Sequence, residues 1–161
     1  AAGGLSDSLR VEWDGSVHMP QQPVALYYDV TTNDSVAQSE LIGFVNASGF
    51  NRGITDSNSK TRFFVPAAGI YAVSFTVAGS LTTPSAGDGI RIIIKKNGST
   101  YATADAYNIA TVGTVAGQEY SFKDMLLVEL GINHYIELQW DNIGGAVFNA
   151  SHGNLNIWKV A

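Results

Sequence analysis

The side chains that could carry acid–base or metal chemistry are few and widely spaced in this sequence. It contains three histidines, His18, His134 and His152, and no cysteine. None of the histidines lies two to five residues from another histidine, as zinc ligands usually do. We therefore interpret all three as ordinary surface or interface residues and expect neither a zinc site nor a thiol nucleophile.

Serines and acidic residues are plentiful, but their settings do not indicate an active site. The Gly-x-Ser-x-Gly elbow that presents a nucleophilic serine is absent from the sequence. Paired catalytic carboxylates can occur in any fold, and six acidic residues show no distinctive setting: Asp88, Asp105, Asp124, Glu129, Glu137 and Asp141. We expect a protein that is not an enzyme. A hydrolase is the alternative that fold alone does not exclude.

The charge pattern argues against two classes of partner. The formal net charge is −5, the basic residues are scattered, and Lys95-Lys96 is their only adjacent pair. Binding to nucleic acid needs a clustered basic face. No apolar run approaches the roughly 20 residues of a membrane-spanning helix. We expect neither nucleic acid nor a membrane among the partners.

The composition is poor in charge. Charged residues make up 14% of the chain, against about 25% in a typical soluble domain. A surface of Gly, Ser, Thr and Asn indicates a domain partly covered by other chains, or else a neutral extracellular or particle-borne domain. The absence of cysteine fits folding in a reducing cytosol.

Alternating apolar side chains predict short strands along most of the chain. In the clearest one, 69–78, the side chains of Tyr71, Val73, Phe75 and Val77 lie on one face. Strands are expected at 24–30, 41–47, 60–65, 69–78, 90–96, 99–106, 118–130, 134–141 and 154–160, with loops at 48–59, 80–89, 107–117 and 142–153. No stretch convincingly shows the period of a helix. The pattern predicts an all-β antiparallel sandwich as one domain, 24–161.

The first 23 residues follow a less regular pattern. Leu9, Val11 and Trp13 alternate, and Asp14-Gly15 is a strong hairpin turn signal. This segment is predicted to be a small hairpin, or an arm that docks on a partner chain through these apolar side chains.

Four motifs in order carry a resemblance to a known fold. They are Phe64-x-Pro66-x-x-Gly69-x-Tyr71-x-Val73-x-Phe75, then Lys96-Asn97-Gly98, then Leu127-Val128-Glu129-Leu130-Gly131 leading into Tyr135-Ile136-Glu137-Leu138, and last Leu155-Asn156-Ile157. Together they resemble the jelly roll of the C1q/tumour-necrosis-factor-like domains, well over 60–161 and loosely over 24–59. Gly131-Ile132 stands where that family often has Gly-Asp, and 149–153 lacks its terminal Phe-Ser-Gly-like signature. These departures suit a bacterial or viral relative.

The resemblance implies a homotrimer. Two features of the residues support it: the face of 69–78 opposite the bulky side chains is small and partly apolar, and both faces of 118–130 carry apolar residues. A sandwich sheet needs only one buried face, so the second is expected to meet another chain or, alternatively, a covering loop. The predicted interface comprises Ala72, Ser74, Tyr120, Met125, Leu127 and Leu155.

Calcium enters only through the resemblance, because some C1q-like trimers bind it. The Asp-x-Asp-x-Asp-Gly spacing of a calcium loop is absent. Ligands could instead meet across a subunit boundary, and the candidates are Asp7, Asp14, Asp29 with Asp34, and Asp141 with Asn142. We otherwise expect no cofactor.

Two functions follow from this interpretation. The first is a structural protein of a virus particle, most simply a trimeric bacteriophage capsid decoration (cement) or fibre protein, made in the host cytoplasm and bound to the major capsid protein or another virion protein. The second is an extracellular or fibre-tip module that recognises a cell-surface glycan or protein. Exposed loop aromatics would then contact the ligand, and the candidates are Phe50, Tyr107 and Phe148.

Overall fold

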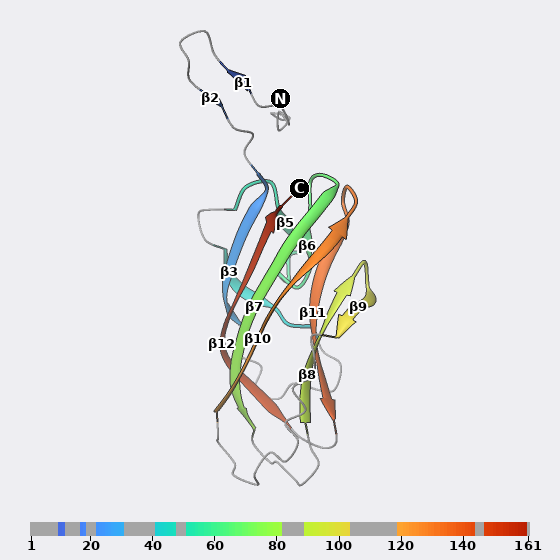
Figure 1. Cartoon of the computed structure of the whole chain (residues 1–161). Helices are drawn as coiled ribbons and strands as arrows, with labels where there is room; N and C mark the ends of the chain where they lie inside the picture. The colour runs from blue at the N-terminus through green and yellow to red at the C-terminus, as the bar shows by residue number, and fades with distance from the viewer. Residues whose placement is uncertain are drawn as a thin grey trace.

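The computed structural model describes residues 10–11, 17–18, 22–30, 41–47, 51–81, 89–103, 119–143 and 147–160. All regular structure in these ranges is β-strand, and Figure 1 shows two sheets stacked face to face. The described residues include no helix able to cross a membrane. The predicted all-β sandwich is confirmed.

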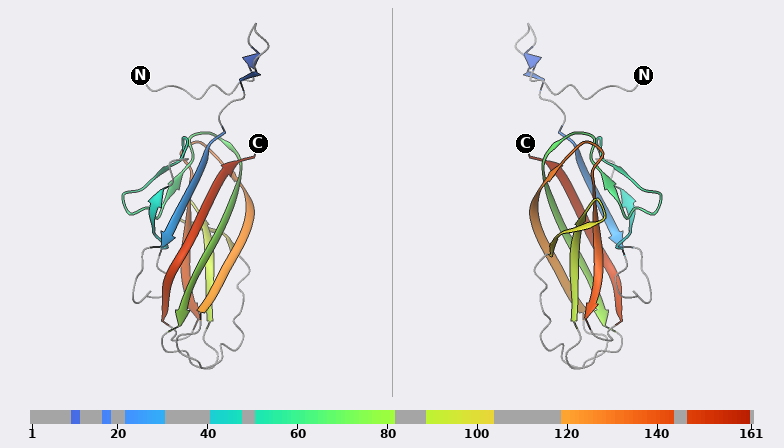
Figure 2. Two further views of the ribbon diagram at one scale, coloured as in Figure 1. Left: turned by 90° about the vertical axis from the view of Figure 1, so that its left-hand side faces the viewer. Right: turned by 90° about the vertical axis from the view of Figure 1, so that its right-hand side faces the viewer.

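One five-stranded antiparallel sheet has the order β10-β7-β12-β3-β4. Its strands are β10 (Glu119–Leu130), β7 (Gly69–Leu81), β12 (Phe148–Lys159), β3 (Val24–Val30) and β4 (Phe44–Ala47). Strands from the two ends of the sequence, β3 and β12, therefore lie side by side in the sheet, as Figure 2 shows.

The second sheet has the order β5-β6-β11-β8-β9. Its strands are β5 (Thr55–Asp56), β6 (Phe63–Phe64), β11 (Tyr135–Ile143), β8 (Gly89–Lys96) and β9 (Ser99–Thr103). Asn97 and Gly98 join β8 to β9 with φ angles of 52° and 80°. Positive φ at both positions is what a type I′ hairpin turn requires, so the predicted turn is confirmed.

Aromatic rings fill both ends of the space between the sheets. At one end, the ring of Trp140 lies 4.6 Å from that of Phe148 and 6.2 Å from that of Phe122. At the other, Tyr27 and Phe63 lie 4.5 Å apart. These tilted and edge-on contacts are the favourable geometries for aromatic pairs, and they hold the two sheets at a fixed separation.

The prediction of a loop over 142–153 is wrong for its last part, since β12 already begins at Phe148. From Phe148 onwards it pairs with β7, and the register shifts at a bulge between Ala150 and His152. A Cβ on Gly79 of β7 would lie only 2.1 Å from the carbonyl oxygen of Asn149. This close approach of two backbones requires glycine at position 79.

The N-terminal segment forms the hairpin that the sequence suggested, with β1 (Arg10–Val11) paired to β2 (Val17–His18). Figures 1 and 2 draw it beyond the end of the sandwich at which β3 begins. Leu9 and Trp13 of the predicted arm lie outside the described residues, so docking on a partner stays a prediction, as does the boundary at residue 23.

Candidate functional site

The outer face of the β10-β7-β12-β3-β4 sheet carries a row of apolar side chains across four strands. Leu127 of β10 pairs with Ala72 of β7, Ala72 with Trp158 of β12, and Trp158 with Val24 of β3. Side chains at directly opposed positions on one face touch their neighbours. The row is therefore continuous from the edge strand β10 to β3.

A second row lies beside the first and is partly polar. It consists of Met125, Ser74, Asn156 and Leu26, again in direct cross-strand register. Farther along the strands the same face becomes polar, with Lys123 opposite Thr76 and Thr76 opposite Asn154. The apolar part thus occupies the end of the sheet at which β7 begins. We call these two rows, with Ile70, the apolar outer face.

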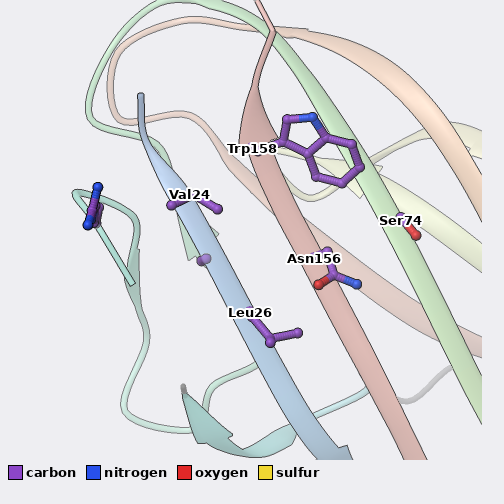
Figure 3. A pocket seen from close by; sticks show the side chains of 7 residues that line it. Val24, Leu26, Ser74, Asn156 and Trp158 are labelled. Atoms are coloured by element: carbon purple, nitrogen blue, oxygen red, sulfur yellow. The ribbon is translucent and has the colours of Figure 1, made fainter. Parts of the chain in front are cut away.

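The apolar outer face has a raised side and a hollow side. On β10, Met125 is 63% exposed and Leu127 is 60% exposed. On the other side of β7, Figure 3 shows Trp158 and Asn156 of β12 beside Val24 and Leu26 of β3. These side chains border a hollow of about 490 Å³ that is also lined by Ala25, Arg52 and Ser74.

The outer face of the second sheet is polar, with acidic groups buried beneath basic ones. Glu137 of β11 is 2% exposed, and its Oε1 accepts a hydrogen bond of 2.8 Å from Nε of Arg62. The same guanidinium lies over the Tyr135 ring. Hydrogen bonding to Glu137 and its negative charge raise the pKa of Arg62. Asp141 forms the equivalent ion pair with Arg91.

The structure corrects two members of the predicted interface. Leu155 is completely buried between the sheets, and Tyr120 packs inward against the core. Both occupy the inward positions of their strands, since Leu155 alternates with Asn156 and Tyr120 with Ser121. Leu155 therefore cannot meet another chain, and the partly buried Tyr120 points away from the apolar outer face.

The remaining predicted interface residues lie on the apolar outer face. Met125 and Leu127 are its most exposed members, and Ser74 lines the hollow. Ala72 is only 2% exposed because its small side chain lies between the cross-strand neighbours Leu127 and Trp158. Whether these residues contact another copy stays a prediction.

Of the three predicted ligand contacts, the structure describes only Phe148. Phe148 is completely buried against Trp140, so the expectation that it projects from an exposed loop is wrong. The side chain turns inward because β12 already begins at this residue. Phe50 and Tyr107 lie outside the described residues.

The calcium candidates do not form a cluster in the part of the chain that the structure describes, where no three acidic or histidine side chains gather. Asp141 is paired with Arg91, and Asp29 has a left-handed φ of 59° on β3. Asp7, Asp14 and Asp34 lie outside the described residues, as does the side chain of Asn142. Calcium binding stays untested.

The two histidines whose side chains the structure describes, His134 and His152, make contacts within their own turn or bulge. Nδ1 of His134 accepts a hydrogen bond of 3.0 Å from the Gly131 amide within one turn. His152 contacts the hydroxyl of Ser151, its neighbour in the β12 bulge, at 2.8 Å. A hydroxyl beside an imidazole is two-thirds of a catalytic triad, but the described residues show no carboxylate that orients this ring.

Sequence reasoning missed the hollow and the buried acids. Val24, Leu26 and Trp158 were placed on strands, yet nothing local shows that strands more than 100 residues apart would frame one depression. Glu137 alternates with the inward Ile136 and Leu138, which predicts an outward side chain, and its burial beneath Arg62 depends on a contact between residues 75 positions apart.

No protein-family model and no curated protein matches the sequence. Many solved structures are similar to it, and two of them serve as examples. The globular domain of zebrafish complement 1qA superposes with a TM-score of 0.60 at 9% identity, covering 86% of this chain and 98% of that one. Eiger TNF from S. frugiperda superposes with a TM-score of 0.55 at 10% identity, covering 87% and 93%. The chain has the C1q/TNF-like jelly-roll fold. At these identities the similarity shows the fold alone.

Proposed function

We propose that this protein is a non-enzymatic structural component that assembles as a homotrimer through the apolar outer face. The observation that carries the proposal is the exposure of Met125 and Leu127 beside a hollow on the same face. Fully burying one Leu or Met side chain contributes about 1.5–3 kcal/mol. A face on which such side chains remain in water is therefore expected to be covered in the working protein.

Cyclic trimers need two different contact surfaces on each copy, because each subunit meets its two neighbours through opposite sides. The raised side of the face, Met125 and Leu127 on β10, and the hollow side, between β3 and β12, meet this requirement. Both sides share cross-strand rows, in which Leu127 lines up with Val24 and Met125 with Leu26. We infer that β10 of one copy fills the hollow of the next.

The wider setting that we propose is a virus particle, with a capsid decoration or fibre protein as the simplest case. The low charge content and the lack of cysteine support this setting, as does the position of the polar second sheet. When the apolar outer faces meet, that sheet stays on the outside of the trimer. It is free to contact the major capsid protein or another virion protein.

Sedimentation equilibrium tests the trimer, with an expected mass of about three times the 17.1 kDa chain. The contact is tested by introducing cysteines at Leu127→Cys and Val24→Cys, since the chain has no cysteine of its own. The double variant should form disulfide-linked trimers. The single Leu127→Cys variant is the control, because covalent dimers there would reveal a symmetric twofold contact.

A monomeric wild type at micromolar concentration would overturn the proposal. Co-purification with particles in fixed ratio tests the viral setting.

A second function is favoured by the polar groups around the hollow. Trp158 offers a ring for stacking, while Arg52 and Asn156 offer hydrogen bonds, a combination that suits a sugar. In this alternative the protein is an extracellular recognition module and the hollow stays open. Glycan-array binding that is lost in Trp158→Ala and kept in Ile132→Ala would support it over the trimer.

A further inference from the structure

Both edge strands of the β10-β7-β12-β3-β4 sheet offer backbone groups to pairing. At one edge, β10 has twelve residues, and β7 is its one partner among the described strands. At the other, β4 has four residues, and β3 is its one partner among them. A long edge strand with exposed apolar side chains is a template for adding strands from other copies, which leads to aggregation.

Two side chains occupy backbone groups along the free side of β10. Nζ of Lys96 donates to the carbonyl oxygen of Glu129 at 2.6 Å. The amide of Met125 donates to Oδ1 of Asp124 at 2.7 Å. Backbone groups of alternate residues point to the same side of a strand, so Met125 and Glu129 both direct theirs away from β7.

Lys96 reaches β10 from the other sheet. It lies on β8 opposite the buried Ile136, so its side chain points toward the space between the sheets. Its ammonium group also lies 5.7 Å from the centre of the Tyr101 ring on β9. An inward-pointing charge is one of the devices by which natural sheets block their edges.

The opposite edge is covered by the backbone of a neighbouring turn. The carbonyl oxygen of Lys60 accepts a hydrogen bond of 3.2 Å from the amide of Phe44. Nζ of Lys60 donates to the carbonyl oxygen of Val45, which by the same alternation faces β3 and is not an edge group. Lys60 has a φ of 50°, which is uncommon for a residue other than glycine. The amide of Lys60 donates a hydrogen bond of 2.7 Å to the carbonyl oxygen of Ser57, which closes this turn.

We propose that Lys96 and Asp124 close the β10 edge of this sheet to strand addition. Copies of the chain then join through the apolar outer face and not by continuing the sheet. Lys95 provides the comparison, because it neighbours Lys96 but lies on the outer face of the second sheet, opposite Glu137. The inference stands whether the face-to-face assembly is a trimer or another oligomer.

The test compares the rate of fibril growth in four proteins at 25 °C, using thioflavin T fluorescence and light scattering. Lys96→Met keeps the length of the side chain and removes the donor. It should grow at least tenfold faster than the wild type. Lys95→Met, which removes an equal charge from a face, should match the wild type. Lys96→Arg, which restores the donor, should also match it.

Equal growth of Lys96→Met and Lys95→Met would overturn the inference, and so would growth of the arginine variant at the rate of the methionine variant. Should Lys96→Met not fold, Asp124→Ala tests the same edge, because Asp124 is exposed and its removal frees the Met125 amide. Severalfold faster growth is expected there, and growth at the wild-type rate would contradict the proposal. Sedimentation of each protein before growth begins reports the face contact separately.

Discussion

The two sheets of this sandwich share one interior but present opposite surfaces to the outside. The apolar outer face shows Met125 and Leu127 to water. The outer face of the second sheet instead buries Glu137 beneath Arg62. Each sheet needs only one apolar face for the fold. The polar outer surface is therefore ordinary, and the apolar one points to a second role, which is contact with other chains.

The two faces should respond differently to mutation, and the largest effect is expected on the apolar outer face. In Met125→Glu/Leu127→Glu, two charges would have to enter the subunit contact, where burial of a charge without a partner is costly. We expect association to weaken at least 100-fold, measured by sedimentation equilibrium. The urea unfolding of the monomer should be unchanged, because both side chains are exposed in it.

Ile132→Glu is the matched control for that variant. Ile132 is 64% exposed and lies in the turn between β10 and β11, outside the apolar outer face. It should associate like the wild type. Equal loss of association in the control would show that net charge, and not the face, governs assembly.

The polar face should show the reverse behaviour, with stability affected and association kept. Arg62→Ala leaves the Glu137 carboxylate buried without the cation that donates to it, which lowers the free energy of unfolding. Glu137→Ala should cost less, because the guanidinium left behind is half exposed and can be hydrated. Urea denaturation measures both, and the opposite order would contradict the burial argument.

The smallest effect concerns the interior that both faces share. Burial, followed by the negative charge of Asp56, raises the pKa of Tyr27 above its ordinary value of 10.0. Above pH 10 the unfolded chain loses this proton while the folded chain keeps it, so stability is fully present below that pH and falls as the pH rises. We expect a loss of about 1 kcal/mol between pH 10 and 11. Tyr27→Phe should remove this part of the pH dependence in urea titrations.

Local pattern predicted the fold well, because side chains that alternate in and out must do so along every strand. The strand 24–30 was predicted to the residue, and the outward positions of Met125 and Leu127 follow from the alternation in 118–130. The same alternation places Tyr120 and Leu155 inward, so assigning them to the interface was an error of inference and not of signal.

The rest depends on contacts between distant segments. The bulge in β12 breaks the alternation of side chains at Ala150. The segment around Phe148 therefore lacks the period of a strand, although it pairs with β7. The hollow needs β3 and β12 to lie together before Trp158 has a partner across from it. The contact of Lys96 with the edge carbonyl of Glu129 likewise joins residues that no local period connects.

The pairing of β3 with β12 also constrains how the chain acquires its structure. Leu26 and Asn156 are direct partners although 130 residues separate them. Closing so long a loop costs entropy before any contact repays it, and sheets built from such distant pairs form slowly. During synthesis β3 must therefore wait, unpaired on the β12 side, until the ribosome has released β12.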